Sequence, residues 1–478
     1  MRIALVALDA TWAHTNLAVR CLREPLEREG HRVQLLECTI NDRTSHILSR
    51  LYEAEAEVYG FSCYIWNLPL VLTLGENLKK LRPTARIVLG GPEVSYATER
   101  FDGMDWIDTI VCGEGEEVFP SLCRKMAEGS DVPRILRAPN AVTMPREGIL
   151  YRDGEATGGM LYYESSRGCP YSCAYCLSSA THGVRMKSVE ETLADLLRFE
   201  TLAGDFRIVK LVDRTFNADV RRANAIWKAL LDDRFTKTYQ FEICASLLDE
   251  ESYAILARFP KGKIQLEIGL QSTSPETLSA VARHLCPSDV LEAVRRLRAP
   301  GNLHLHLDLI AGLPFEDYDR FAQSFDEAYG IADQLQLGFL KLLYGTPLRE
   351  RMEEYGYLCQ SEPPYTVLAS RWLSYPEMQR LVRIEETLSR VVESGRFSHT
   401  LWYLDARMPS PFRFWEGLTD FLLAEDCRPI QKRSQPEIFG ALLTYGSRLP
   451  GVEEVRLKEM LAADFFAGEN KKPPRFLR

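Results

Sequence analysis

The sequence predicts an α/β fold in three regions: an N-terminal doubly wound parallel sheet, a central partial (β/α)6 barrel, and a mostly helical C-terminal region. Apolar runs alternate with helix-length segments up to about residue 126, and six further strand-like runs separated by loops or helices follow. Beyond about residue 363 the pattern is mostly helical. A chain of 478 residues also exceeds what one hydrophobic core usually supports. We therefore expect domains at residues 1–127, 160–345 and 346–478, with a linker at 128–159.

The N-terminal region contains five strand-like runs separated by segments of helix length. In such sheets, ligands bind in loops beyond the carboxyl ends of the strands. The five runs are RIALVAL (2–8), RVQLLE (32–37), EVYGFS (57–62), RIVLGG (86–91) and DTIVCGEGE (108–116). The loops at their ends are Asp9 to Asn16, Ser62 to Asn67, Gly90 to Ser95 and Gly113 to Glu117.

Residues 128–159 lose this periodicity and are rich in proline, glycine and mixed charge, which is typical of a linker. A second series of strand-like runs follows, each succeeded by a loop or helix, which suits an open partial barrel. The six runs are Leu161–Ser166, Ile208–Asp213, Gln240–Ile243, Ile264–Ile268, His304–Ile310 and Leu335–Phe339.

Composition narrows the class of protein. A hydrophobic content of 46% and a charged content of 26% are ordinary for a folded globular chain. The net charge of −9 makes nucleic acid an improbable main partner, because such binding needs a concentrated basic surface. The sequence has no apolar run of membrane-spanning length and no cleavable-signal layout, so we expect a cytoplasmic protein without a membrane anchor.

Three of the 12 cysteines cluster closely, at Cys169, Cys173 and Cys176, directly after the first strand of the second series. A structural zinc site needs four ligands, and no fourth cysteine or histidine lies at a customary spacing, although His182 follows Cys176 by six residues. Three thiolates suit a 4Fe-4S cluster with one open iron. The alternatives are a structural metal knuckle or incidental thiols.

The segment ESSRGCPYSCAYC resembles the signature of the radical S-adenosylmethionine (SAM) superfamily, including the aromatic residue before the last cysteine. The resemblance implies that these cysteines hold a 4Fe-4S cluster, that its open iron chelates SAM, and that one electron then yields a 5'-deoxyadenosyl radical. Polar strand ends in the barrel resemble the family's cofactor-binding motifs; the alternative for each residue is a strand-end cap or turn. The residues so assigned to SAM are Tyr175, Ser178, Asp213, Arg214, Glu242, Glu267, Gln271, Ser272, Asp308, Gly312 and Pro314.

The N-terminal region resembles the cobalamin-binding half of cobalamin-dependent radical SAM enzymes through LDATWAHTNLA, YGFSCYIWN, VLGGPEVS and IVCGEGEEVF. The motif D-x-H-x-x-G with a cobalt-ligating histidine is missing, because Asp9 and His14 are five residues apart, so we do not expect His14 to be an axial ligand. A relic or docking domain is the alternative. The residues that the resemblance assigns to cobalamin are Thr11, Trp12, His14, Asn16, Ser62, Tyr64, Trp66, Gly90, Gly91, Pro92, Glu93, Gly113, Glu114 and Gly115.

These resemblances imply a cobalamin-dependent radical SAM enzyme that methylates an unactivated carbon or phosphinate-like centre of a small molecule or peptide. Reduction would come from a donor such as flavodoxin or ferredoxin. Two alternatives remain: a cobalamin-dependent rearrangement or cyclisation without methyl transfer, and a non-catalytic iron-sulfur or zinc interaction protein. The substrate and the role of the C-terminal region do not follow from the sequence.

Overall fold

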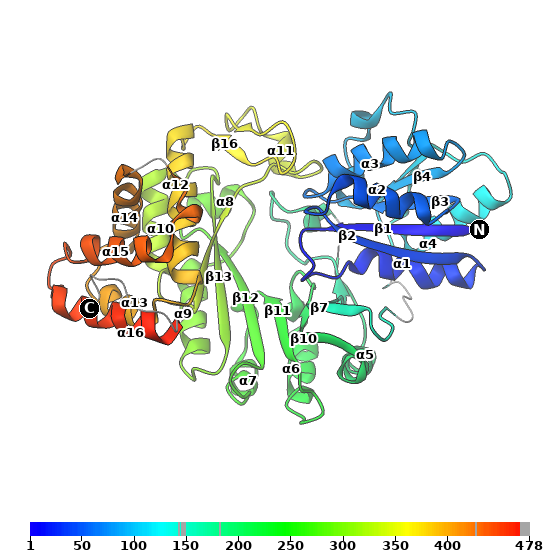
Figure 1. Ribbon diagram of the computed structural model, residues 1–478. Coiled ribbons are helices and arrows are strands. Elements are labelled where there is room, and N and C mark those ends of the chain that lie inside the picture. Colours follow the sequence, from blue (N-terminus) through cyan, green and yellow to red (C-terminus); the bar gives the residue numbers. More distant parts are fainter. Residues whose placement is uncertain (142–143, 145–149, 181–182, 426–427, 469–478) are drawn as a thin grey trace.

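The computed structural model describes residues 1–478 except 142–143, 145–149, 181–182, 426–427 and 469–478. Figure 1 shows the N-terminal domain and the C-terminal helices on opposite sides of the central barrel sheet. The chain forms two six-stranded sheets, one in the N-terminal domain and one in the barrel. Both are parallel throughout, which confirms the α/β fold class.

The first sheet has six strands in the order β2-β1-β3-β4-β5-β6 and is covered on both faces. Helices α1 and α4 pack together on one face, and α2 and α3 on the other, so two separate apolar cores form. The strands are β1 (Arg2–Asp9), β2 (Arg32–Thr39), β3 (Val58–Ser62), β4 (Arg86–Gly90), β5 (Thr109–Cys112) and β6 (Ile135–Arg137). The helices are α1 (Leu17–Arg28), α2 (Thr44–Glu53), α3 (Leu68–Leu81) and α4 (Gly115–Ala127).

Strand β6 extends this sheet into the segment that the sequence predicts as a linker. It pairs with β5 through Ile110 and Ile135. The first barrel strand, β7 (Ala156–Tyr163), also begins inside that segment and pairs with β10. Both ends of residues 128–159 therefore contribute edge strands, one to each sheet.

The second sheet is an open half-barrel with the strand order β14-β13-β12-β11-β10-β7. Its outward side chains, such as Leu266 and Leu307, are buried against helices, whereas their neighbours Glu267 and His306 on the concave side are partly exposed. The remaining strands are β10 (Gly204–Leu211), β11 (Thr238–Ile243), β12 (Ile264–Gln271), β13 (His304–Ala311) and β14 (Gln334–Phe339). The helices are α5 (Val189–Thr201), α6 (Val220–Ala229), α7 (Glu250–Leu256), α8 (Pro275–Ala280), α9 (Pro287–Arg298) and α10 (Tyr318–Ala328).

The C-terminal region packs on the far side of the barrel, where α14 contacts α10 (Figure 1). It starts with α11 (Pro347–Glu350) and an antiparallel pair of short strands, β15 (Leu358–Cys359) and β16 (Val367–Ala369). Its helices are α12 (Tyr375–Leu388), α13 (Ser398–Asp405), α14 (Pro411–Glu425), α15 (Gln435–Gly446) and α16 (Glu454–Gly468). In the described part of the chain, every helix is too short or too polar to cross a bilayer.

Candidate functional site

A cavity of about 740 Å³ lies between the two parallel sheets and takes its walls from both. The first domain contributes the loops after β1, β3, β4 and β5, and the barrel contributes β7 and the loops after β8 (Ser166–Arg167) and β10. Most residues predicted to bind cobalamin line this cavity: His14, Asn16, Ser62, Tyr64, Trp66, Gly90, Gly91, Pro92, Gly113, Glu114 and Gly115. Ser178 and Arg214, predicted to bind SAM, line it as well.

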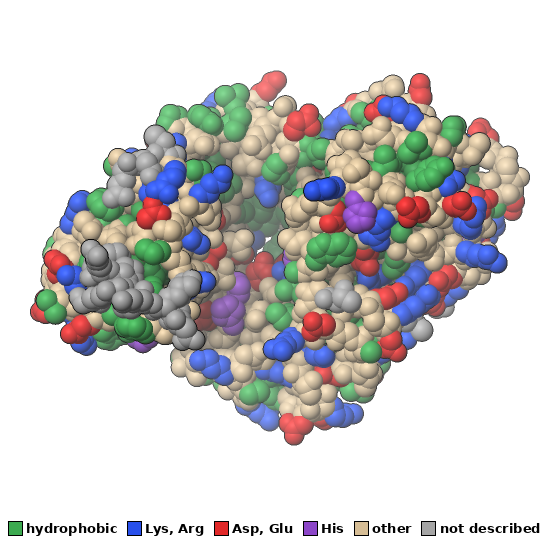
Figure 2. Space-filling model, viewed as in Figure 1, with side chains coloured by type: hydrophobic (Ala, Val, Ile, Leu, Met, Phe, Trp, Pro, Cys, Tyr) green, Lys and Arg blue, Asp and Glu red, His purple; other side chains and the backbone are tan. Residues whose placement is uncertain are grey.

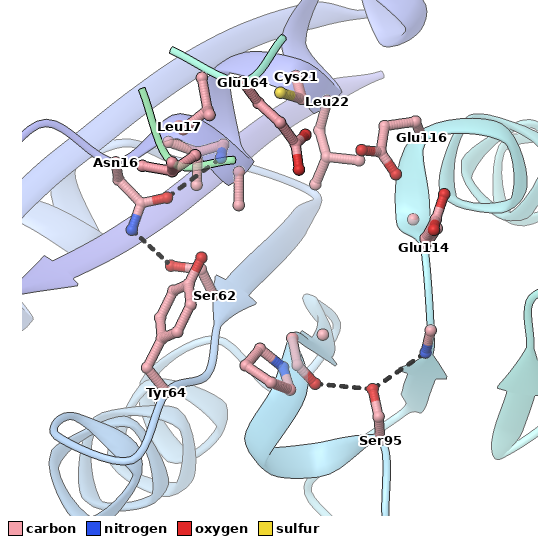
Figure 3. Close-up of a pocket in the computed structure, with 18 of the residues that line it drawn as sticks. Asn16, Leu17, Cys21, Leu22, Ser62, Tyr64, Ser95, Glu114, Glu116 and Glu164 are labelled. Atoms are coloured by element: carbon pink, nitrogen blue, oxygen red, sulfur yellow. Dashed lines mark hydrogen bonds between the residues drawn. The ribbon is translucent and has the colours of Figure 1, made fainter. Parts of the chain in front are cut away.

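Two glycines shape the wall at the ends of β4 and β5. Gly91 has φ +115°, and a Cβ there would lie 2.6 Å from the Cys63 carbonyl oxygen. Gly113 has φ +88°. The Ser95 hydroxyl donates to the Gly91 carbonyl at 2.8 Å and accepts from the Gly113 amide at 3.0 Å (Figure 3). The two loops are thereby held together as a backbone cradle without side chains, which permits the close approach of a large flat ligand.

The cavity continues from this cradle along the face of the first sheet that α1 and α4 cover. Its walls there are apolar. Gly60 lets the Phe119 ring pack directly on the sheet backbone, because a Cβ at position 60 would lie only 3.0 Å from that ring. The apolar residues along this extension are Leu17, Val19, Leu22, Val88, Val111 and Phe119. The cavity thus joins a glycine-lined opening to an apolar extension, and both are large enough together to suit a bulky cofactor such as cobalamin.

Asn16 organises the first loop at the carboxyl end of β1. Its Oδ1 accepts from the Val19 amide at 3.3 Å and so caps α1, while its Nδ2 donates to Asp9 at 3.1 Å and to Ser62 at 3.5 Å. Burial raises the pKa of Asp9 to about 6 against the hydrogen bond from Asn16. Two strand ends are thus joined at one side of the cavity.

His14 faces the barrel. Its Nδ1 lies 2.6 Å from the Tyr162 hydroxyl on β7, and burial lowers its pKa. This contact agrees with a hydrogen-bonding role rather than metal ligation. Tyr64 and Trp66 stack with ring centroids 4.4 Å apart and form an aromatic part of the wall.

Three predicted cobalamin residues do not line the cavity. Thr11 and the exposed Trp12 lie in the loop after β1, where the Thr11 hydroxyl accepts from the Ala13 amide. Glu93 is buried behind the cradle and accepts hydrogen bonds from Arg100 at 3.2 Å and from the Tyr365 hydroxyl at 2.6 Å. Tyr365 belongs to the C-terminal region, which therefore reaches the loop that carries Gly91.

The opposite end of the cavity carries a network of charges across the domain boundary, of which Figure 3 shows the three glutamates Glu114, Glu116 and Glu164. Arg167 forms ion pairs with Glu114 at 3.1 Å, Glu116 at 2.8 Å and Glu164 at 2.6 Å, and Arg185 donates to Glu114 at 2.9 Å. Burial by itself would raise the pKa of Glu114, but the hydrogen bond from Arg185 and the charge of Arg167 hold it below its ordinary value. The network fixes the strand before Cys169 against the N-terminus of α4.

The three clustered cysteines follow β8 directly and precede a short 3-10 turn, Leu177–Ala180. Cys169 Sγ lies 3.4 Å from the Thr215 hydroxyl, and Cys173 Sγ lies 3.6 Å from Arg283 Nη1. The same guanidinium donates to the Tyr175 hydroxyl at 3.4 Å. Arg283 lies just after α8 and places positive charge beside the Cys173 thiol, which would favour a bound anionic cluster.

No three His, Cys, Asp or Glu side chains of the described residues converge as the ligands of one metal ion. His182 lies outside the described residues. The three cysteines remain the predicted ligands of a cluster, which would contact each of them through a different iron.

Four of the predicted SAM residues face the concave side or mouth of the barrel: Glu242, Glu267, Gln271 and Asp308. Glu242 lies 3.9 Å from Arg214, and burial raises its pKa to about 7. Burial, together with the charges of Glu267 and Glu242, raises the pKa of Asp308 to about 7. Asp308 Oδ1 and Gln271 Oε1 are buried without a hydrogen-bond partner among the described residues. These orphaned acceptors suit the amino and hydroxyl groups of a polar cofactor.

Four other predicted SAM residues hold loops together. Asp213 is fully buried and accepts from the Ser165 hydroxyl at 2.8 Å. Ser272 donates to the buried Glu316 at 2.6 Å. Gly312 is packed beneath the C-terminal region, where the Tyr357 hydroxyl donates to its carbonyl at 2.9 Å, and Pro314 is buried.

Comparison with protein families divides the chain along the same lines. Residues 4–123 match the B12 binding domain, and residues 163–328 match the radical SAM superfamily. The chain thus combines a B12 binding domain with a radical SAM domain. In this enzyme, residues 353–478 match a further family described as "Protein of unknown function (DUF4080)".

Individual relatives are distant. This radical SAM enzyme is 25% identical over 343 residues to the cobalamin-dependent radical SAM methyltransferase TokK of Streptomyces tokunonensis, covering 63% of this chain and 50% of TokK. It is 24% identical over 333 residues to the hopanoid C-3 methylase of Methylococcus capsulatus, covering 64% of this chain and 62% of that protein. The chain thus spans about half of TokK and less than two thirds of the methylase.

The fold has a solved counterpart. The cobalamin-dependent S-adenosylmethionine radical enzyme OxsB, with aqua-cobalamin and S-adenosylmethionine bound, superimposes with a TM-score of 0.64 at 16% identity, over 97% of this chain and 83% of that one. A likeness at this identity concerns the arrangement of domains. The cofactors that belong to the two matched domains are a 4Fe-4S cluster with SAM, and cobalamin.

Proposed function

We propose that this enzyme transfers a methyl group from cobalamin to an unactivated carbon, or a phosphinate-like centre, of a small molecule or peptide. The single observation that supports this is the shared cavity. Its walls include both the glycine cradle at Gly91 and Gly113 and the loop residues Arg167, Gly168 and Leu177 that flank the cysteines. A methyl carrier on one side would thus stand close to a radical source on the other.

The names of TokK and the hopanoid C-3 methylase support methyl transfer. Because the chain covers only part of each, the activity of the whole protein remains a proposal. When bound, the cluster with SAM supplies a 5'-deoxyadenosyl radical, and cobalamin supplies the methyl group.

The chain's own residues have distinct roles in this proposal. Cys169, Cys173 and Cys176 would ligate the cluster, and Arg283 balances charge beside Cys173. Asp308 and Gln271 would orient SAM through their buried oxygens that lack a partner among the described residues, and Glu242 would assist from the end of β11; these roles stay predictions. Tyr64 and Trp66 stack on each other in the cavity wall and would offer an apolar surface to the corrin on that side.

The test is the product set of the reconstituted, reduced enzyme with SAM. We expect both S-adenosylhomocysteine and 5'-deoxyadenosine, and neither iron nor 5'-deoxyadenosine in a variant with all three cysteines replaced by alanine. 5'-Deoxyadenosine without S-adenosylhomocysteine would refute methyl transfer and favour a rearrangement or cyclisation. Activity in the cluster-free variant would refute the radical assignment itself.

A further inference from the structure

The concave side of the half-barrel carries two rows of polar side chains, and the upper row includes Glu242 and Glu267, which the sequence assigns to SAM. In the lower row the strand register aligns Lys210, Gln240, Gln265 and His304. The upper row aligns Glu242, Glu267, His306 and Gln334. Residues in one register of a parallel sheet point to the same side. Figure 2 shows the molecule hollowed between its lobes, with charged and histidine side chains visible in the hollow.

We infer that this floor, defined by Lys210, Glu267 and His306, binds a polar part of the substrate that has hydrogen-bond donors and acceptors side by side, as an amide or amino-acid group has. The inference rests on the proposed function and narrows its substrate to a polar metabolite or peptide. A hydrocarbon substrate is thereby excluded.

Lys210 and Glu267 form the centre of the floor. Lys210 Nζ lies 3.0 Å from Glu267 Oε2, which also accepts from Gln240 at 3.2 Å. The side chains are 21% and 25% exposed, so the pair faces the hollow and is only partly removed from water. Lys210 has three donors and uses one here, and Glu267 Oε1 has no hydrogen bond to a described residue. The pair therefore offers donors and an acceptor to a ligand.

His306 adds a second polar group beside this pair. Its ring packs edge-on against His304 with centroids 4.5 Å apart. Its Nε2 is buried and has no hydrogen-bond partner among the described residues. A buried ring nitrogen without a partner is costly, and a ligand group that bonds to it removes the cost.

The depth of the floor separates it from the cofactors. His306 precedes Asp308 by two residues on β13, which places it about 7 Å further from the strand ends. A substrate anchored there by its polar group would extend toward the strand ends, where the cysteines and the cavity lie. A hydrocarbon in the same place would take water from Lys210 and Glu267 without replacing its hydrogen bonds.

Two small probes test the inference on the holoenzyme with SAM: acetamide, which has adjacent donors and an acceptor, and benzene, which has neither. Crystals soaked in each should show acetamide between Lys210, Glu267 and His306, and no benzene. Benzene at the floor, or neither probe there, would overturn the inference.

In solution, Lys210→Met should weaken the saturation-transfer signal of acetamide about tenfold, because a hydrogen bond from a charged donor is lost. Lys261→Met, an exposed lysine in the turn before β12, is the matched control and should not change it. An unchanged acetamide signal in Lys210→Met would contradict the inference that the floor binds a polar group. If that variant does not fold, the soak of wild-type crystals still tests the inference. A preparation without corrin and iron would refute the proposed function separately, because the soak reports on the floor alone.

Discussion

Tyr365→Phe tests whether the C-terminal region helps to hold the cobalamin cradle. The Tyr365 hydroxyl donates to Glu93 Oε1 at 2.6 Å and accepts from Arg100 at 2.8 Å, and Tyr365 is only 1% exposed. Glu93 lies two residues after Gly91, so this contact bears directly on the cradle.

The size of the effect follows from the partners. Hydrogen bonds to charged groups contribute about 1.5–3 kcal/mol each, but the Arg100 guanidinium, which lies 3.2 Å from Glu93, should compensate in part for the lost hydroxyl. We therefore expect the ordered conformation of the loop that carries Gly91 and Glu93 to become less stable, relative to its disordered state, by about 2 kcal/mol. If the loop must be ordered to bind corrin, cobalamin affinity falls about 30-fold.

The assay is cobalamin titration of the purified chain, followed by corrin absorbance, with thermal unfolding in parallel. Tyr344→Phe is the matched control: its ring lies 3.9 Å from the Arg100 guanidinium, but its hydroxyl makes no hydrogen bond to a described residue. Equal cobalamin affinity in Tyr365→Phe, Tyr344→Phe and wild type would refute the reasoning.

Two further predictions concern the charges of the site. Glu114→Gln should lower the free energy of unfolding by about 2 kcal/mol in chemical denaturation, because Arg167 and Arg185 lose a partly buried partner. The effect is limited to this size because Glu116 and Glu164 still pair with Arg167. The exposed Glu99→Gln is the control, and equal stability of the two variants would contradict the network. Glu242→Gln tests burial in the cofactor-free chain. Since the folded pKa of Glu242 is about 7 against an ordinary 4.5, the folded state binds more protons between these values, and wild-type stability falls as pH rises through that window. The variant should match wild type near pH 4 and exceed it by up to about 3 kcal/mol above pH 7; a difference that does not change with pH would contradict the assignment.

The fold was predictable where the pattern is local. The long strands β1, β12 and β13 alternate or bury apolar side chains over eight residues each, and the sequence predicts them. Strand β6 has only three residues, all at least partly exposed, and Pro133 precedes it, so its pattern resembles a linker. The glycines at 158 and 159 obscure the start of β7 in the same way.

The candidate site also has one part that the sequence predicts and another that only the folded structure reveals. The three cysteines lie within eight residues, so their spacing and the family resemblance of that segment predict a 4Fe-4S cluster from the sequence. The pair Lys210 and Glu267 is separated by 57 residues, and Glu93 and Tyr365 by 272, so only the folded chain brings them together. Asp213 and Ser272 end strands as cofactor-binding residues do, yet both side chains are buried and bond to neighbouring loops. A single sequence does not distinguish these two uses of a polar strand end.

The most direct test of the account is the corrin, iron and sulfide content of the chain after anaerobic purification from cells supplied with cobalamin. The account predicts about one corrin per chain together with the iron and sulfide of one 4Fe-4S cluster. Iron and sulfide without corrin would contradict it, and would leave a radical SAM enzyme whose N-terminal domain serves only as a docking or relic domain.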